Sequence, residues 1–358
     1  MAPVYYRVSL KTPFSRFGRR FRPNPQKVFF ESAYKLRGEI MKYIADGAII
    51  TNRILFSDGR VVSDIMGGSG MYAYSALRLC TPDSMLIAGV GKDFDQFYGK
   101  WFTENQCVRD GLVVTVEKTN YNELKYNSDG SYIEYSIYGD EYEKENYPKT
   151  VCDISALRPF VHDAKGVYTC AVLNDRNTRA LMEMKGGNPF KVMWEIPEST
   201  VDDVAVLYRE KGLNGLLDRL RAVDIFSLNR NESYRIFGVH TPEDAINELL
   251  KLDRPVYYRV GRSGAYIVDG GVYHVPMLRS VEPELEIDPT GCGNSSTAAA
   301  MWAYCEGYDP LTVCVIGNMM ASFNVQQYGL YPNMSRDAFH HMMELVDTYK
   351  SNLKNGRV

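Results

Sequence analysis

The sequence contains a glycine-rich loop of the kind that binds an anion at the start of a helix. Residues 286–297 read EIDPTGCGNSST, and the apolar residues 298–302 that follow predict a helix. The backbone N–H groups of a first helical turn have no partner within the helix, so they can bind phosphate. Gly291, Cys292 and Gly293 would direct such groups at charge developing on a transferred phosphoryl group. A purely structural strand–helix junction is the alternative.

Asn294 follows this loop where a phosphotransferase would place an acid beside the transferred phosphate. Its carboxamide can form a hydrogen bond with an acceptor hydroxyl, but it cannot take up a proton at physiological pH. General base catalysis typically contributes a factor of about 10²–10⁴ in rate. Phosphoryl transfer owes most of its acceleration to positioning, metal and electrostatic stabilisation. We therefore expect a slow site rather than an inactive one, unless another group takes the proton.

Two further motifs have residue types suited to binding a phosphorylated ligand. Gly67 and Gly68 have no Cβ, so a polar ligand can approach their backbone; close packing of a helix on a strand is the alternative. Asn229 and Glu232 follow an apolar run that predicts a strand, and the carboxylate is suited to hold a hydrated Mg²⁺ beside phosphates. An ordinary helix N-cap is the alternative for this second pair.

The elements that would position these motifs alternate between strand and helix. Short apolar runs bounded by glycine are typical of strands buried on both faces of a sheet. The strands are expected at 47–51, 85–91, 166–172, 191–196, 223–228 and 255–261, with helices near 93–106, 174–186, 200–220, 241–252, 291–306, 310–327 and 335–352. This order predicts an α/β fold with a doubly wound, mostly parallel sheet flanked by helices.

Two segments break this alternation and predict hairpins. Residues 53–65 and 123–137 alternate apolar and polar residues around Asp58-Gly59 and Asp129-Gly130, which are strong hairpin signals. Hairpins inserted near the carboxyl ends of early strands would form a small β lid over a ligand crevice. We therefore expect one domain at 45–358, with lid hairpins near 53–65 and 112–138.

Residues 1–44 are expected to form a basic N-terminal extension. Residues 1–42 hold ten lysine and arginine residues against two acidic ones, Glu31 and Glu39. The simplest interpretation is a solvated extension that packs across the fold through its aromatic residues. A contact between subunits and an anion-binding arm are the alternatives.

The composition of the whole chain excludes several classes of protein. Its 358 residues carry a net charge of -3, which gives no general attraction to nucleic acid or to a membrane surface. Its seven cysteines are scattered and show no CxxC spacing, so the sequence indicates neither a disulfide framework nor a zinc site. Without a membrane-length apolar run or a signal peptide, the expected location is the cytoplasm.

Taken in order, the motifs resemble those of the ribokinase/pfkB family of carbohydrate and nucleoside kinases. The similar stretches are GGSGMYAYSALRL from 67, LIAGVGKDFDQFYGKWF from 86, NRNE at 229–232, GRSGAYIV at 261–268 and DPTGCGN at 288–294. Each glycine pair alone is a weak signal. Their order and spacing together form a specific one, and the resemblance covers roughly residues 45–350.

The resemblance implies ATP-dependent phosphorylation of a small molecule and assigns a role to each motif. The glycine pair at 67–68 would contact the sugar, and the NxxE motif would hold Mg²⁺. Gly261 and Gly264 begin a turn that would follow the nucleotide phosphates, although a simple hairpin is the alternative. Asn318 would contact the nucleotide. Asp288 and Gly329 fall where ribokinase-like enzymes bind a monovalent cation, which makes K⁺ an optional cofactor.

The sequence departs from the family pattern at three positions around the substrate. Asn294 replaces the aspartate that takes the acceptor proton, and Asn52 replaces an aspartate that binds sugar hydroxyls. Tyr72 stands where many members have an asparagine. Because an aromatic ring offers a stacking surface, an aromatic or less hydroxylated acceptor is as reasonable as a sugar.

Three functions remain open at this point. The favoured one is an ATP-dependent kinase of a sugar or nucleoside hydroxyl. The second is a pseudokinase that binds nucleotide or a small ligand, and the third is a phosphate-binding enzyme of another reaction on the same fold. The expected partners are small molecules, with no nucleic acid and no membrane. A homodimer is open because some family members exchange lid strands.

Overall fold

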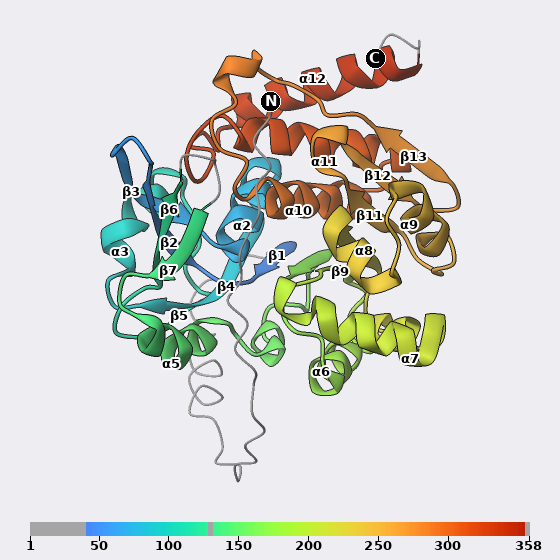
Figure 1. Ribbon diagram of the computed structural model, residues 1–358, viewed down its shortest axis with the longest axis horizontal. Helices are drawn as coiled ribbons and strands as arrows, with labels where there is room; N and C mark the ends of the chain where they lie inside the picture. Colours follow the sequence, from blue (N-terminus) through green and yellow to red (C-terminus); the bar gives the residue numbers. More distant parts are fainter. Residues whose placement is uncertain (1–40, 128–131, 355–358) are drawn as a thin grey trace.

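The computed structural model describes residues 41–127 and 132–354. Its centre is a nine-stranded sheet in the order β13-β12-β11-β10-β9-β8-β1-β4-β5 (Figure 1). The strands are β1 (Tyr43–Asp46), β4 (Ser84–Gly91), β5 (Leu112–Val116), β8 (Gly166–Thr169), β9 (Lys191–Glu195), β10 (Ile225–Asn229), β11 (Val256–Arg259), β12 (Ala265–Val268) and β13 (Val272–Val275). Neighbours from β5 to β11 are parallel, whereas β12 and β13 pair antiparallel. This confirms the predicted doubly wound, mostly parallel sheet.

Helices cover both faces of this sheet. Successive residues of a strand point to opposite faces, and here both faces carry apolar side chains that the helices bury. In β1, Ile44 packs in one apolar core and Ala45 in the other. The core that contains Ala45 lies under α2 (Ser69–Cys80), α10 (Cys292–Cys305), α11 (Pro310–Asn324) and α12 (Arg336–Lys354). The core that contains Ile44 lies under α6 (Asp175–Lys185), α7 (Val201–Leu220), α8 (Arg230–Phe237) and α9 (Pro242–Leu249). Burial on both faces explains the continuous apolar strand runs.

Shorter helices flank the β4–β5 edge of the sheet. They are α3 (Phe94–Phe97), α4 (Gly99–Glu104) and α5 (Asp140–Thr150). The aromatic side chains of α3 and α4 pack with those of α2, and Phe94 stacks on Tyr98 with ring centroids 5.1 Å apart. The predicted helix over 93–106 is therefore two short helices.

A second sheet of four strands has the order β3-β2-β6-β7. Its strands are β2 (Ile50–Leu55), β3 (Val61–Gly67), β6 (Tyr121–Tyr126) and β7 (Tyr132–Ser136). The β2–β3 pair is the hairpin predicted at 53–65, and β6 and β7 also pair antiparallel. The predicted turn at Asp129-Gly130 lies outside the described residues. The small core of this sheet consists of Ile54, Ile65 and Leu124.

Two predicted strand positions were wrong. The first strand of the large sheet is β1, whereas the run predicted at 47–51 ends in β2, which belongs to the small sheet. The chain turns at Gly47, where a Cβ would lie 2.7 Å from the backbone nitrogen of Gly70. Residues 112–116, expected within a lid hairpin, instead form β5 beside β4. Their β-branched run suits an edge strand of the large sheet equally well.

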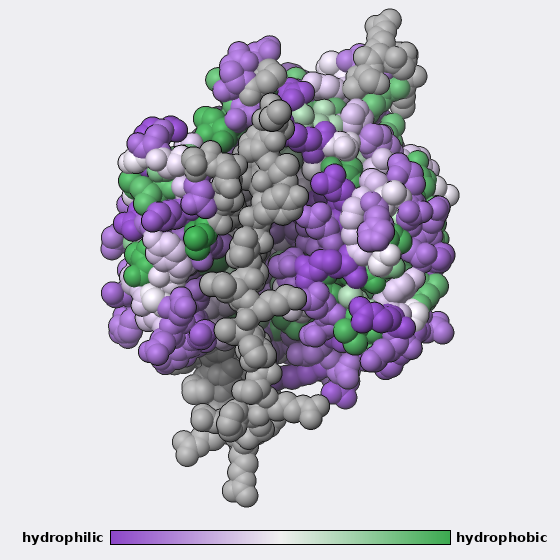
Figure 2. Space-filling model, in the orientation of Figure 1, coloured by the Kyte–Doolittle hydropathy of each residue, from purple (hydrophilic) through white to green (hydrophobic). Residues whose placement is uncertain are grey.

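The predicted extension overlaps the folded core at its end. Residues 43 and 44 belong to β1, and residues 1–40 lie outside the described part of the chain. On the face shown in Figure 2, hydrophilic side chains predominate among the coloured residues and apolar ones are scattered. No helix among the described residues combines the length and the hydropathy of a membrane span.

The strand order reverses between β1 and β8, and ligands of such sheets bind beyond the carboxyl ends of the strands at this point. Here Thr169 Oγ1, at the end of β8, donates a 2.8 Å hydrogen bond to Asp46 Oδ2 at the end of β1. Burial raises the pKa of Asp46 to about 7, and the hydrogen bond from Thr169 opposes this shift.

Candidate active site

The glycine-rich loop forms the N-terminus of α10, next to the reversal point. Its N-cap, Gly291, has a φ of 78°, and no side chain of the described residues caps this helix. Side chains cap several other helices, as Thr241 does for α9 and Asp309 does for α11. The first turn of α10 therefore keeps backbone N–H groups free of a side-chain cap, which is the arrangement that an anion needs.

The ring of Tyr72 closes one side of this loop. A Cβ on Gly291 would overlap the ring, and a Cβ on Gly67 would lie 3.3 Å from Tyr72 Cε2 and 2.8 Å from Asn52 Nδ2. The structure thus brings Gly291 together with Asn52, Gly67 and Tyr72, which lie more than 200 residues earlier in the sequence. Because Tyr72 is only 2% exposed, its ring is a wall between the small sheet and the loop and not an open stacking surface.

Gly68 has a structural reason to be glycine. It is the N-cap of α2 with a φ of 97°, and a Cβ there would lie 2.7 Å from the backbone nitrogen of Ile50. This is the close backbone packing named above as the alternative interpretation of the glycine pair.

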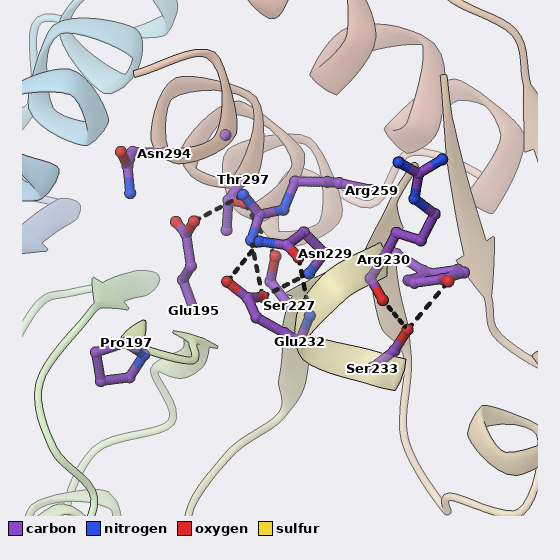
Figure 3. A network of polar contacts seen from close by, with 12 residues as sticks. Glu195, Pro197, Ser227, Asn229, Arg230, Glu232, Ser233, Arg259, Asn294 and Thr297 are labelled. Carbon is purple, nitrogen blue, oxygen red and sulfur yellow. Dashed lines mark hydrogen bonds and ion pairs between the residues drawn. The ribbon is translucent and has the colours of Figure 1, made fainter. Parts of the chain in front are cut away.

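Asn294 is held by a buried pair of side chains at the start of α10. Its Nδ2 donates to the hydroxyl of Tyr168 at 3.2 Å, and this hydroxyl donates to Glu195 Oε2 at 2.7 Å. Tyr168 is in β8, and Glu195 ends β9 with 5% of its surface exposed. Since a carboxylate only accepts and the hydroxyl has one proton, Asn294 must present its NH₂ to Tyr168. Its Oδ1 therefore points away from Glu195 (Figure 3).

Glu195 also holds an arginine against the loop. Its Oε1 forms a 2.8 Å ion pair with Arg259 Nη1, and Arg259 Nη2 lies 3.8 Å from Glu232 Oε2 (Figure 3). The guanidinium packs directly on Gly293, where the Nη1 nitrogen leaves no room for a Cβ. Gly293 is therefore required for the arginine to reach the first turn of α10.

The NxxE pair forms a capping box at the start of α8. Asn229 Oδ1 accepts from Glu232 N at 3.0 Å, and Glu232 Oε2 accepts from Asn229 N at 2.5 Å. Burial raises the pKa of Glu232 to about 7, while the Coulombic attraction of Arg259 acts in the opposite direction. The structure thus shows the N-cap role of this motif, and it leaves the carboxylate in the cluster beside Arg259.

Two of the residues predicted to contact the nucleotide, Gly264 and Asn318, lie around the end of β13. Gly264 has a φ of 94°, and a Cβ there would collide with the backbone at 275–277. Asn318 Nδ2 donates to Val275 O at 3.0 Å and to Pro276 O at 3.2 Å. Gly261 begins an exposed 3₁₀ turn, and no atom of the described residues lies within 4 Å of the position that a Cβ would take there. The structure therefore brings together Gly264 and Asn318 and leaves Gly261 in open space.

Asp288 and its neighbours form a separate polar group beneath the loop. Asp288 Oδ1 accepts from Thr290 N at 2.9 Å, and burial raises the pKa of Asp288. Asn324 Nδ2 donates to Thr290 O at 2.8 Å, while its buried Oδ1 has no hydrogen-bond partner among the described residues. Gly329 packs against β3, with its Cβ position 2.9 Å from Met66 O.

Cys292 contributes its backbone and not a reactive thiol. Burial raises the pKa of its thiol to about 12, and Sγ lies 3.4 Å from Ala321 O. A protonated thiol is a weak nucleophile.

Tyr168, Glu195 and Arg259 were not among the site residues predicted from the sequence. Each lies at or next to the end of an otherwise apolar strand, in GVYT, KVMWE and VYYR respectively. A polar side chain at the end of a buried strand is the signal that would have identified them. Carboxyl ends of parallel strands meet at one edge of the sheet, which is where such folds bind ligands.

A comparison with known families agrees with this geometry. The sequence pattern of the family described as pfkB family carbohydrate kinase matches residues 62–337, more than half of the chain. The chain belongs to the pfkB family. This pfkB-family chain is 23% identical over 285 residues to a cytidine kinase of Thermococcus kodakarensis, in a match that covers 77% of the chain and 92% of the relative.

Solved structures share the fold of this pfkB-family chain. The nucleoside kinase of Methanocaldococcus jannaschii, an archaeal member of the ribokinase family, matches with a TM-score of 0.62 and 19% identity over 87% of this chain and 100% of that one. A putative ribokinase II from E. coli, in complex with ATP and Mg²⁺, matches with a TM-score of 0.63, 19% identity and the same coverage. These similarities confirm the ribokinase-like fold that the motifs predicted.

Proposed function

We propose that this protein transfers the γ-phosphoryl group of ATP to a hydroxyl group of a sugar or nucleoside-like small molecule. The observation that carries the proposal is the N-terminus of α10, which has no side-chain cap among the described residues and has a guanidinium packed on Gly293. Partial positive charge from the helix and full charge from Arg259 meet there, at the edge where α/β sheets bind ligands. Membership of the pfkB family supports the same reaction.

In this reaction the acceptor oxygen forms a bond to the γ-phosphorus as the bond to the bridging oxygen of ADP breaks. ADP leaves with the electron pair, and the acceptor proton passes to water because Asn294 cannot take it. Asn294 Oδ1, which faces away from Tyr168, accepts a hydrogen bond from the acceptor hydroxyl and orients it. The N–H groups of the first turn of α10 stabilise charge on the phosphoryl oxygens.

Mg²⁺ fits this site as an ion that arrives with the nucleotide. The described residues contain no group of three or more potential metal ligands, so they form no cage for a resident ion. Glu232 offers a hard carboxylate group beside Arg259, the type that Mg²⁺ binds together with phosphates and water. Bound there, Mg²⁺ would neutralise charge on the phosphates. Without Mg²⁺, the two carboxylates beside a single guanidinium would repel the phosphates of the nucleotide.

Nucleotide binding tests this function directly. Calorimetry should show ATP binding that strengthens with Mg²⁺, and Glu232→Ala should reduce the Mg²⁺ dependence more than it reduces binding of bare ATP. Asp244→Ala is the matched control, since Asp244 occupies the same N3 position in the capped helix α9, away from the site. If neither ATP nor ADP binds with or without Mg²⁺, the kinase proposal is wrong.

The acceptor belongs to the sugar or nucleoside class. Support for a nucleoside comes from the cytidine kinase and nucleoside kinase relatives. Asn52 offers an amide where a sugar-binding carboxylate was expected. A thermal-shift screen of nucleosides and sugars identifies the class, because a ligand at 100 times its dissociation constant stabilises the fold by about 2.7 kcal/mol.

A catalytically silent pseudokinase is the second candidate, and Asn294 is the observation that favours it. Asn294→Asp separates the two functions. A gain of about 10²-fold in turnover means that the base is the missing element of a kinase site. No gain over a measurable wild-type rate means that another group already takes the proton. If neither protein turns over ATP with any acceptor of a broad panel, the pseudokinase stands.

A monovalent cation is an optional cofactor of the loop. Asp288 and the unpartnered Oδ1 of Asn324 are buried oxygen atoms on either side of Thr290, and such atoms suit a weakly hydrated cation. K⁺ should then raise the affinity for Mg-ATP relative to Na⁺, and Asn324→Leu should abolish the difference. Equal affinity in both salts would exclude this site.

The cysteines support a cytoplasmic location, and the edges of the small sheet offer a surface for a second copy of the chain. We place the protein in the cytoplasm, since its seven cysteines are free thiols, with small molecules as its ligands. A homodimer would form through the small sheet, whose edge strands are β3 and β7. Light scattering distinguishes a dimer from a monomer of 40.7 kDa.

A further inference from the structure

We infer that Arg259 is a phosphate-binding residue that contacts the phosphoryl group being transferred. This inference rests on the proposed phosphoryl transfer. It concerns a residue that lies outside the glycine-rich loop and outside the other motifs that resemble the family. Its evidence is the place of the guanidinium, the donors that it leaves unpaired, and the way in which two carboxylates fix it.

The place of Arg259 follows from the sheet register. Arg259 is the last residue of β11 and pairs with Asn229 of β10, while Glu195 pairs with Ser227 on the other side of β10. The arginine side chain therefore crosses the end of β10 to reach the end of β9 (Figure 3). Its guanidinium meets the first turn of α10 at Gly293, next to the N–H groups that would bind the same phosphate.

The guanidinium also keeps unused hydrogen-bond donors. The Arg259 side chain is only 13% exposed, and its Nε and Nη2 atoms are buried without a hydrogen-bond partner among the described residues. The 3.8 Å separation from Glu232 is within ion-pair range but too long for a hydrogen bond. Because buried donors are normally satisfied, these two atoms indicate an acceptor that binds with the substrate. Phosphate oxygens fit the planar fork of an arginine.

Two carboxylates hold Arg259 before any ligand arrives. Glu195 has its other oxygen fixed by the fully buried Tyr168, so the ion pair is anchored at both ends. A preorganised charge acts on the transition state without rearrangement during the reaction. An arginine that contacts the transferred phosphoryl group can contribute a factor of about 10³–10⁵ in turnover. Such a contribution would offset much of the loss of the base at Asn294.

The test compares two nucleotides that differ only in the γ-phosphate. Binding of Mg-ADP and of the non-hydrolysable Mg-β,γ-methylene-ATP is measured for the wild type, Arg259→Gln and Arg259→Lys. We expect Arg259→Gln to weaken the triphosphate by about 10–100-fold, as for a charge-assisted hydrogen bond, and to change ADP affinity by less than about threefold. Arg259→Lys should restore part of the loss, since it keeps the charge but not the fork.

The outcomes separate this inference from the proposed function. Equal weakening of both nucleotides, or an unchanged ratio, shows that Arg259 is structural and overturns the inference while the kinase function stands. A wild type that binds neither nucleotide overturns the proposed function itself. Arg158→Gln is the control, because Arg158 forms an exposed ion pair with Glu183 and lies outside the site.

A second variant covers the case in which Arg259→Gln does not fold, since it leaves Glu195 buried without its counter-charge. Arg259→Gln/Glu195→Gln removes both charges of the pair; it keeps the size of the side chain at position 195 and shortens the one at position 259. The same selective loss of triphosphate affinity is expected. A double variant that retains the wild-type ratio of the two affinities overturns the inference.

Discussion

The amide of Asn294 and the carboxylate of Glu195 share one hydroxyl group, that of Tyr168. The Tyr168 hydroxyl donates a hydrogen bond to Glu195 and accepts one from Asn294. Burial raises the pKa of Tyr168 well above its usual range, so the hydroxyl stays neutral and the direction of both hydrogen bonds is fixed. Because Glu195 accepts the hydrogen bond of the Tyr168 hydroxyl, residue 294 has to be a donor, and an asparagine meets this requirement.

This relationship predicts a coupling between positions 294 and 195. Asn294→Asp would set a second acceptor against a hydroxyl whose proton is already committed, so we expect a loss of about 1–2 kcal/mol in the free energy of unfolding. In Asn294→Asp/Glu195→Gln the new amide donates to Tyr168, and Tyr168 donates to the aspartate. Urea unfolding of both single variants and the double variant should give a favourable coupling of about 1–2 kcal/mol. Additive losses would contradict the shared hydroxyl.

The contact between Tyr72 and Gly291 predicts a steric cost at the loop. Gly291→Ala adds a Cβ where the ring lies and also strains a φ of 78°. Gly307→Ala is the matched control, because Gly307 has a φ of 83° but open space around its Cβ position. We expect about 1 kcal/mol of destabilisation for the control and about 2–4 kcal/mol for Gly291→Ala. Equal losses in thermal unfolding would show that the ring moves aside freely.

The raised pKa of Asp46 predicts that the free energy of unfolding decreases as the pH rises. Its folded-state pKa of about 7 lies above the ordinary aspartate value of 3.8, so the folded state holds a proton that the unfolded chain releases. The contribution is complete below pH 4 and is lost as the pH rises towards about 7, by up to about 4 kcal/mol for a shift of about three pH units. Asp46→Asn should therefore flatten the pH dependence of unfolding between about pH 4 and 8. Parallel profiles for wild type and variant would refute this shift.

The small sheet should become more protected when substrate binds. Its own core is small, and Gly67 of β3 packs near the Tyr72 ring, which in turn lies against Gly291 of the loop. Elements with few apolar contacts open most easily, so amide hydrogen exchange over 50–67 and 121–126 should be fast in the free protein. Saturating nucleotide and acceptor should slow it, while exchange in β8 and β9 stays unchanged. Equal rates with and without ligand would show that this sheet is not a lid.

Much of the fold followed from local patterns. Buried parallel strands read as continuous apolar runs, and the β2–β3 hairpin was marked by Asp58-Gly59. The two misplaced strands show the limit of such patterns. Residues 50–55 and 112–116 have strand composition in either sheet, and which sheet each joins depends on partners that are far away in the sequence.

The sequence by itself determined the α/β class, the glycine loop before α10 and the absence of a carboxylate at Asn294, because these depend on residue type and short spacing. Only the tertiary structure decided what surrounds the loop. Tyr168 and Glu195 are 27 residues apart in the sequence, and Glu195 and Arg259 are 64 residues apart. The order of the strands in the sheet places the ends of their three strands close together. Their polar groups act together because burial removes water as an alternative partner, and burial is a property of the packed sheet and helices, not of any one segment.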